Sequence, residues 1–418
     1  MIPQSQKVLC RRHFLASAVW LSASKTLLAG SNAYIQEQSP PNLAENIYLR
    51  IGVQTVINAL GTVTRLGGSI MPPEVITAME EAGKYFIPLP ELHQKVGERL
   101  AQLIGVEAAT VTSGAAGAIT LGTAACMTQG DPDRIRQLPD TTGMKNEVII
   151  QKAHRKSYEA QIRLVGAKIV EVETKAQLEA AFTPKTAMLF FINTFDSKGQ
   201  IGRRDWALTG KRHGVPTFND AAADLPPKER LSKYVKMGFD LVAFSGGKGL
   251  LGPQCSGLLL GRRNLVEAAR MNGSPWSGIG RGMKVGKEEI VGLLVAVERY
   301  LRINHEDENR LLESRVATIV SVLSPIKGVR TQIFVPEIAN HVPHLSVEWD
   351  INQIPITSEN AARHLKEGNP PIEVGGHRWL QSKSNLEPDL QGLTVSVWML
   401  GVSEVQIVAR RLQTMLNG

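Results

Sequence analysis

Cysteine is scarce in this chain of 418 residues. Its three cysteines, Cys10, Cys126 and Cys255, are too widely spaced to form a disulfide framework, and no group of cysteine and histidine has the spacing of a zinc site. We therefore expect Cys126 and Cys255 to be structural thiols. The fold must depend on a hydrophobic core, for which 43% apolar residues suffice, and the length suits one large domain with a smaller one.

Long apolar runs and a strong net charge are absent as well. The mean hydropathy is close to zero, which excludes a protein with many membrane spans. The formal charge of +8 falls to +4 without the first 33 residues, because that stretch holds four basic residues and no acid. Aromatic residues make up 5% of the chain, and no basic stripe is interleaved with them. Nucleic acid is therefore not expected as a partner, and the charge allows only a weak attraction for anionic substrates.

The N-terminus has the pattern of an export signal. Arg11 and Arg12 come before an apolar run at residues 18–21 that is too short to span a bilayer, and Ser31–Ala33 offers small residues for cleavage. This predicts a signal peptide over residues 1–33, and the paired arginines resemble the twin-arginine type, which exports folded proteins. We expect a periplasmic or extracytoplasmic protein without stable membrane insertion after signal removal. The alternative is an uncleaved N-terminus on a cytoplasmic protein.

Strand-like apolar runs alternate with helical patterns beyond a linker at residues 34–50. The expected strands are Ala109–Thr112, Glu147–Gln151, Lys168–Val172, Ala187–Asn193, Thr217–Asn219, Leu241–Phe244 and Gly257–Leu260. Short continuous apolar strands between helices predict an α/β fold with a mostly parallel sheet covered on both faces. We assign residues 51–304 to this large domain and residues 305–418 to a smaller C-terminal α+β domain that ends in an amphipathic helix at 402–416.

Lys248 stands in the glycine-rich stretch Ser245–Gly249, directly after an apolar strand. A lysine that is partly desolvated has a lowered pKa and can form a Schiff base, and the glycines would let a ligand approach the backbone. A P-loop is excluded, because Val242 and Gly249 stand where that motif needs glycine and a hydroxyl residue. Taken alone, a lysine between glycines is a weak indication.

Asp220 follows the preceding apolar strand. Carboxyl ends of neighbouring strands in a doubly wound sheet meet at one edge, so we expect Asp220 and Lys248 to share a crevice. An acid that keeps a pyridine nitrogen protonated, together with a lysine, is what pyridoxal-phosphate chemistry requires. Without that lysine, Asp220 would be equally compatible with capping a helix.

Two further strand ends carry small or planar side chains. Ser113, Gly114 and Ala115 lead from a strand into a helix, where a hydroxyl and backbone N–H groups can bind a phosphate, although tight packing with a serine cap is the alternative. His154 could stack on a cofactor ring, although a lone histidine is more often structural. The chain order of phosphate loop, stacking residue, acid and lysine favours a pyridoxal-phosphate site that holds its cofactor as an imine on Lys248.

Five stretches of the chain resemble those of a known family. They are Asn58–Thr62, Val111–Gly117, Asn219–Ala222, Ser245–Gly249 and Met283–Glu289, of which the last is the most distinctive. Residues 57–301 resemble the fold-type I pyridoxal-phosphate enzymes of the selenocysteine synthase-like branch. That branch includes the seryl-tRNA selenium transferase and proteins like D-glucosaminate-6-phosphate ammonia-lyase.

The resemblance implies a role for each matching residue. Lys248 is the imine lysine and carries protons, Asp220 pairs with the pyridine nitrogen, and His154 stacks on or near the ring. The phosphate is held by Ser113, Gly114 and Ala115. Candidates for binding an anionic group of the substrate are Arg65, Arg281, Lys284, Lys287 and Arg378. Arg281, Lys284 and Lys287 could instead be a basic helix start on the surface, or could reach a neighbouring subunit, because such sites are usually completed in a homodimer or higher homo-oligomer.

The expected reaction is α,β-elimination from a small amino acid or amino sugar acid, with release of ammonia. The selenium transferase has an extra N-terminal region for tRNA, and an exported protein would not meet tRNA, so that activity is not expected. Transfer, racemisation or aldol cleavage on the same imine are the enzymatic alternatives. An exported ligand-binding protein on the same fold is the alternative without catalysis.

Overall fold

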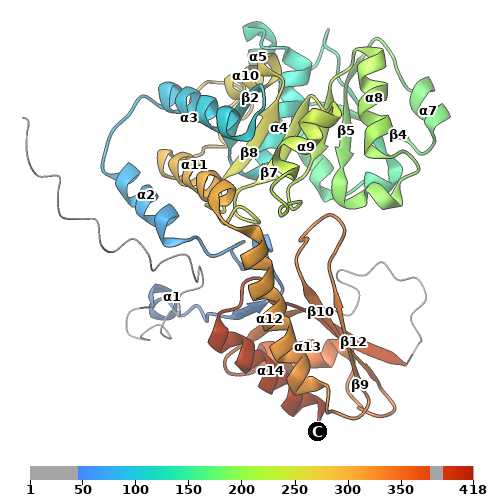
Figure 1. Ribbon diagram of the computed structural model, residues 1–418. Helices are drawn as coiled ribbons and strands as arrows, with labels where there is room; N and C mark the ends of the chain where they lie inside the picture. The colour runs from blue at the N-terminus through green and yellow to red at the C-terminus, as the bar shows by residue number, and fades with distance from the viewer. Residues whose placement is uncertain (1–45, 377–388, 418) are drawn as a thin grey trace, which may run out of the picture. The chain divides into compact units, whose positions relative to one another are not determined.

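The computed structural model describes residues 46–376 and 389–417 (Figure 1). The predicted signal at residues 1–33, most of the predicted linker and Arg378 lie outside the described residues. The short helix α1 (Ile47–Arg50) falls within the predicted linker. Within the described ranges, no helix is long and apolar enough to cross a membrane.

A seven-stranded sheet forms the larger part of the structure, in the order β2-β8-β7-β6-β5-β3-β4. Its strands are β2 (Ala108–Thr112), β3 (Glu147–Gln151), β4 (Lys168–Val172), β5 (Thr186–Ile192), β6 (Thr217–Asp220), β7 (Leu241–Ser245) and β8 (Gly257–Gly261). The neighbours from β4 to β7 pair in parallel, whereas β8 is antiparallel to both β7 and β2. Two antiparallel pairings restore the original direction, so β2 points the same way as β7. The predicted strands and the mostly parallel sheet are confirmed.

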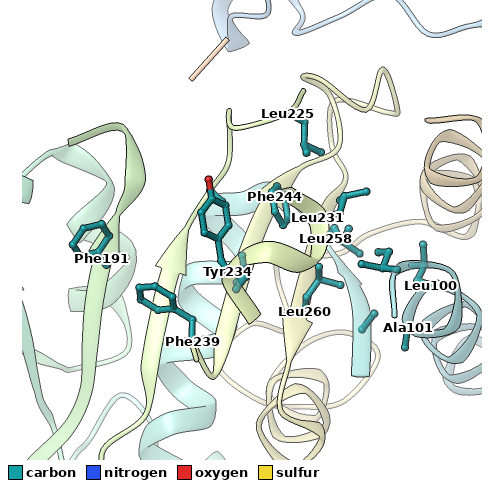
Figure 2. Packing of buried hydrophobic residues seen from close by; sticks show 14 of the residues in the cluster. Leu100, Ala101, Phe191, Leu225, Leu231, Tyr234, Phe239, Phe244, Leu258 and Leu260 are labelled. Atoms are coloured by element: carbon teal, nitrogen blue, oxygen red, sulfur yellow. The ribbon is translucent and has the colours of Figure 1, made fainter. Parts of the chain in front are cut away.

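Helices cover both faces of this sheet, because successive residues of its strands face opposite layers. Phe191 packs on one face among residues of α3 (Leu89–Ile104), α8 (Arg203–His213), α9 (Arg230–Met237) and α11 (Lys287–Arg302). Figure 2 shows Phe191 in this layer with Tyr234 and Phe244. Its neighbour Phe190 packs on the other face with α4 (Gly114–Thr128), α6 (Ala160–Leu164) and α10 (Arg263–Met271).

Helix α4 is buried from Gly117 to its end, because it lies directly against the sheet. Its sequence has small and apolar residues on every side, which is typical of a fully buried helix. A Cβ on Gly122 would lie 2.4 Å from the ring of Phe218, so glycine is needed for this close approach. Cys126, on the same helix, is buried as a structural thiol should be, whereas Cys255 is exposed.

The remaining strands form a second sheet in the order β1-β11-β12-β10-β9. They are β1 (Ile57–Ala59), β9 (Val329–Phe334), β10 (His344–Asp350), β11 (Ile372–Gly376) and β12 (Leu390–Ser396). Its core also takes apolar residues from α12 (His305–Leu323), α13 (Ser358–Glu367) and α14 (Val402–Leu416), which matches the helix predicted at 402–416.

The predicted domain boundaries need one correction. We placed residues 51–304 in the large domain, but β1 pairs in parallel with β11 of the second sheet. A three-residue strand is too short to show a periodicity of its own, and its pairing is set by a partner far along the chain. Near the predicted boundary at residue 304, α11 ends at Arg302 and α12 begins at His305.

Candidate functional site

Lys248 and Asp220 lie at the carboxyl ends of two adjacent strands. Asp220 is the last residue of β6 and pairs in register with Ala243 of β7, after which the chain turns to Lys248. Asp220 is 7% exposed, and Lys248 is half-buried. Burial lowers the pKa of Lys248 and raises the pKa of Asp220 to about 6, while the opposite charge of each partner works against both changes. The amine and the acid therefore lie close enough for the charge of each to act on the pKa of the other.

The glycines around Lys248 are required by the protein's own backbone. A Cβ on Gly247 would lie 2.5 Å from Cα of Gln254, and one on Gly249 would lie 2.3 Å from the carbonyl oxygen of Leu225. The turn is closed by a hydrogen bond of 2.9 Å from the N–H of Leu251 to the carbonyl of Lys248. We predicted these glycines for ligand approach, and the structure adds a second reason, which is that the turn holding Lys248 is tightly packed.

Ser113 begins helix α4 without capping it, because its side chain accepts no hydrogen bond from the first turn. Gly114 has a φ of 73°, which favours glycine, and its carbonyl accepts a 2.9 Å hydrogen bond from the hydroxyl of Thr112. The Ser113 hydroxyl and the first N–H groups of α4 are thus available to an anion at a positive helix end. The alternative in which Ser113 caps the helix is not what the structure has.

These residues fit pyridoxal phosphate. A half-buried amine can attach the aldehyde of the cofactor, and a buried carboxylate on the neighbouring strand suits the pyridine nitrogen. The start of α4 has no side-chain cap and suits the phosphate. It follows β2, which runs in the same direction as β7.

Comparisons with known proteins agree with this geometry. The family model "SelA: L-seryl-tRNA selenium transferase" matches residues 161–334. The chain is 31% identical to a D-glucosaminate-6-phosphate ammonia lyase of Salmonella typhimurium, over 83% of this chain and 94% of that protein. A solved structure of D-glucosaminate-6-phosphate ammonia-lyase matches with a TM-score of 0.76 and 29% identity, covering 89% of this chain and 98% of the other. This chain belongs to the selenocysteine synthase-like branch of the fold-type I pyridoxal-phosphate enzymes.

Two further proteins extend the comparison. The branch also contains a 5'-C-glycyluridine monooxygenase-decarboxylase of Streptomyces sp., which is 32% identical over 78% of this chain and 83% of that protein. Serine palmitoyltransferase of Sphingomonas wittichii has a TM-score of 0.55 at 15% identity, covers 86% of this chain and 87% of its own, and shows the fold alone. The protein is therefore a pyridoxal-phosphate-dependent enzyme of fold-type I.

Gly257 of β8 sets how closely Ser113–Ala115, the loop predicted to bind the phosphate, can approach the sheet. A Cβ on Gly257 would lie 2.3 Å from the carbonyl carbon of Gly114, and backbone cannot move aside as a flexible side chain can. We expect Gly257→Ala to weaken cofactor binding by about tenfold or more, because the loop must shift by a large part of an ångström. Cofactor titration of the apoprotein measures this. Gly202→Ala is the matched control, since nothing lies within 4 Å of the added Cβ, and equal affinities for the two variants would contradict the prediction.

His154 lies at the carboxyl end of β3, as predicted, but its ring is fully buried. Its Nδ1 accepts a hydrogen bond of 3.3 Å from the N–H of Ile192, and its Nε2 lies 3.0 Å from the carbonyl of Phe195. The ring packs edge-on against Phe191, and burial lowers its pKa to about 4, so it is neutral at pH 7. A ring that stacks on a cofactor needs one open face, and this ring has none. The stacking role stays a prediction. In the structure, the hydrogen bonds of His154 join β3 to the end of β5.

The predicted anion-binding residues are not equivalent. Lys287 donates to the carbonyl of Ala82 at 2.7 Å and pairs with Glu288, so it holds the start of α11 to α2 (Pro73–Gly83). The structure thus supports the alternative of a helix-start residue for Lys287. Arg65 is mostly exposed and pairs with Glu373 of β11 at 3.2 Å.

Arg281 and Lys284 are exposed on the loop before α11. Arg281 is 3.5 Å from the hydroxyl of Ser274, and within the described part of the chain neither cation forms an ion pair. Arg281 and Lys284 therefore remain candidates for binding an anionic group of the substrate. Arg378 lies outside the described residues.

A buried polar network beside the site was missed from the sequence. Asp224 is almost fully buried, and its Oδ2 accepts hydrogen bonds from Tyr234 at 2.6 Å and from Asn193 at 2.8 Å. The amides of Asn193 and Asn219 bond to each other at 2.7 and 2.8 Å, which links β5 and β6 next to Asp220. Burial raises the pKa of Asp224. A second acid close behind Asp220 in the sequence was the available indication, but its partners come from separate elements.

The bond between Tyr234 and Asp224 is expected to stabilise the fold measurably. Tyr234→Phe removes a donor to a buried carboxylate and leaves the rest of the ring in place. We expect the free energy of unfolding to fall by about 1.5–3 kcal/mol, measured by urea denaturation of the apoprotein. Tyr158→Phe, at an exposed tyrosine, is the control and should change the stability little. A Tyr234→Phe protein as stable as the parent would show that water replaces the lost donor.

Proposed function

We propose that this enzyme is a lyase that acts on a small amino acid or amino sugar acid by α,β-elimination and releases ammonia. The observation that carries the proposal is the pairing of a half-buried Lys248 with a buried Asp220 at adjacent strand ends, in a chain that matches an ammonia lyase over most of both lengths. The similarity extends over 94% of that relative, so the same site can be present in this chain.

Pyridoxal phosphate supplies the electron sink that makes the α-proton of an amino acid acidic. Asp220 is the residue whose negative charge would favour the protonated form of the pyridine nitrogen when the cofactor is bound. Lys248, whose pKa is lowered by burial, accepts the α-proton on Nζ. The same Nζ then delivers a proton to the departing β-substituent, which leaves with its bonding electrons. Water later replaces nitrogen, and the products are ammonia and a keto acid.

Exposed cations on one loop favour an acidic substrate. Arg281 and Lys284 lie on that loop and form no ion pair within the described ranges, so both are free to attract a carboxylate or a phosphate ester. Arg65 already pairs with Glu373 and would have to exchange that partner. We therefore favour sugar acids and phosphorylated amino sugar acids over neutral amino acids.

The second candidate is decarboxylation at the α-carbon. It is favoured by the Streptomyces relative, which is as similar to this chain as the lyase is and whose name states a monooxygenase-decarboxylase. Loss of carbon dioxide would use the same lysine and acid but would break a different bond at the α-carbon.

Product analysis separates these reactions. The purified holoenzyme is incubated with a panel of D- and L-amino acids and 2-amino-2-deoxy sugar acids, with and without a 6-phosphate. Elimination yields equal amounts of ammonia and keto acid, and decarboxylation yields carbon dioxide. Racemisation or transfer yields none of these three products. A binding protein without catalysis would show no exchange of the α-proton in deuterated water. If no substrate releases ammonia, the lyase proposal is wrong.

We also propose that two copies of the chain complete the site. Support comes from three consecutive large side chains, Tyr85, Phe86 and Ile87, that are exposed between α2 and α3, with Phe86 entirely so. Single exposed apolar residues are ordinary, but an aromatic cluster on the surface is typical of an interface. Light scattering at micromolar concentration is expected to give at least the mass of a dimer, and a monomeric mass would contradict the proposal.

Export through the twin-arginine route is a further proposal. Its support is the pair Arg11 and Arg12 before a short apolar run. Cell fractionation should find the protein outside the cytoplasm, and replacing both arginines by lysine should retain it inside. An equal distribution for the two forms would speak against this route.

A further inference from the structure

A small pocket lies at the free edge of the large sheet, where β2 has a neighbour on one side only. It is lined by His93 of α3, Thr110 of β2 and Arg270 of α10, and is closed by loop residues that include Ser274 and Met283. Its interior has room for about one water-sized sphere. No residue proposed above for catalysis lines it.

Three buried polar atoms of this pocket have no hydrogen-bond partner among residues 46–376 and 389–417. They are Nδ1 of His93, Oγ1 of Thr110 and Nε of Arg270. His93 is 4% exposed and Thr110 is 2% exposed. An unsatisfied buried polar group costs about 1–3 kcal/mol, so three around one small space indicate that something polar occupies it.

The chemistry of these atoms selects an acceptor with negative charge. A guanidinium can only donate, and Arg270 forms no ion pair within the described residues. The ring of Trp276 covers it, with its centroid 5.8 Å from the guanidinium carbon, and lies 6.0 Å from the ring of His93. Burial and the nearby Arg270 lower the pKa of His93 to about 4, so its imidazole is neutral and can place its one proton on Nδ1. The hydroxyl of Thr110 can donate as well.

We propose that this pocket binds one monovalent inorganic anion of the size of chloride. Such an ion accepts a hydrogen bond from each of the three atoms and neutralises Arg270. A water molecule can fill the same space, but it leaves the partly buried positive charge without a counter-charge. Chloride is somewhat larger than the water-sized sphere that this space admits, so the closing residues Ser274 and Met283 must move slightly outwards to hold it, whereas phosphate and sulfate are far too large.

The site joins three elements, because its contacts come from α3, β2 and α10. Thr110 lies on the strand that leads into Ser113–Ala115. Anion binding in the pocket therefore stabilises the edge of the sheet that leads into Ser113–Ala115. The bound anion takes no part in the reaction.

Thermal unfolding of the holoenzyme tests this binding. Sodium chloride is exchanged against sodium gluconate at constant ionic strength, so that general screening does not change. We expect the Tm to rise by roughly 2 °C when chloride reaches ten times its dissociation constant, with bromide giving a similar rise. In crystals grown with bromide, one anomalous peak is expected between His93, Thr110 and Arg270.

Two variants and a control complete the experiment. Thr110→Val keeps the shape, removes the unpartnered hydroxyl and should lose most of the chloride effect, while it unfolds in gluconate at the same or a higher temperature than the parent. Arg270→Gln should lose the effect entirely. Arg263→Gln, at an exposed arginine of the same helix, should keep it. An equal Tm in chloride and gluconate, or bromide crystals without a peak in the pocket, would mean that water alone fills it and would overturn the proposal.

Discussion

Replacing Lys248 by alanine is expected to abolish both turnover and covalent attachment of the cofactor. Among the described residues, Lys248 carries the only amine that lies close enough to Asp220 for their charges to interact. We expect turnover to fall by at least about 10³-fold, because the variant loses the proton carrier as well as the attachment point. The visible absorption of the attached cofactor should disappear, and borohydride should no longer fix the cofactor to the protein.

The control for Lys248→Ala is Lys233→Ala, at an exposed lysine of α9. This variant should keep the absorption and the turnover of the parent. Mass spectrometry of a peptide digest after borohydride treatment identifies the modified lysine directly. A cofactor label on another lysine, or an unchanged absorption in Lys248→Ala, would show that the site has been assigned to the wrong residue.

Asp220→Asn is expected to have the second largest effect. The substitution keeps the shape, and the amide oxygen can still accept the 3.0 Å hydrogen bond from the N–H of Ala222. It removes the negative charge opposite the pyridine nitrogen, and we expect turnover to fall by about 10²- to 10³-fold, as for loss of one preorganised electrostatic contact.

The pH dependence of cofactor binding gives a sharper test of Asp220. Burial raises its pKa to about 6 in the protein without cofactor. As the pH falls through 6, the carboxyl takes up a proton and loses its charge, so the affinity of the apoprotein for the cofactor should decrease below pH 6. The ratio of the affinities of parent and Asp220→Asn should therefore be large at pH 7.5 and approach one near pH 5. A ratio that does not change with pH would remove Asp220 from this role.

Stability should change in the opposite direction to activity. A carboxyl whose folded pKa lies above its unfolded value binds more protons when folded, so its contribution to stability is present at low pH and is lost as the pH rises through 6. The Asp220→Asn apoprotein, which never carries this buried charge, should be at least as stable as the parent at pH 7.5. A marked loss of stability would mean that the lower activity reflects unfolding.

Much of the large domain could be predicted from local patterns. Each of the seven predicted strands is present: Glu147–Gln151 and Lys168–Val172 have the predicted bounds, and the other five differ by one residue at one or both ends. The central strands, such as Thr186–Ile192, are apolar along their length because both faces of the sheet are covered. Lys248 and Asp220 could be paired in advance, because the carboxyl ends of parallel strands meet at one edge.

Other features depend on contacts between distant parts of the chain and had no local pattern. His154 was placed correctly at a strand end, but its burial against Phe191 follows from how β5 passes beside β3. Asn193 and Asp224 are polar residues of ordinary appearance, and only their meeting makes them a buried network. From the sequence, Lys287 fits a basic helix start and an anion-binding residue equally well. Its hydrogen bond to the carbonyl of Ala82 favours the helix start.

The sequence by itself determined the fold class and the strand ends at which Lys248, Asp220 and Ser113–Ala115 stand. Each of these follows from residues that are near one another in the chain, through strand periodicity, glycine spacing or a strand end. Only the tertiary structure decided that β1 joins the second sheet, that the His154 ring is closed off, and that His93, Thr110 and Arg270 meet in one pocket. The physical reason is that burial and hydrogen-bond satisfaction are properties of the packed chain, and one segment does not specify which distant segment will cover it.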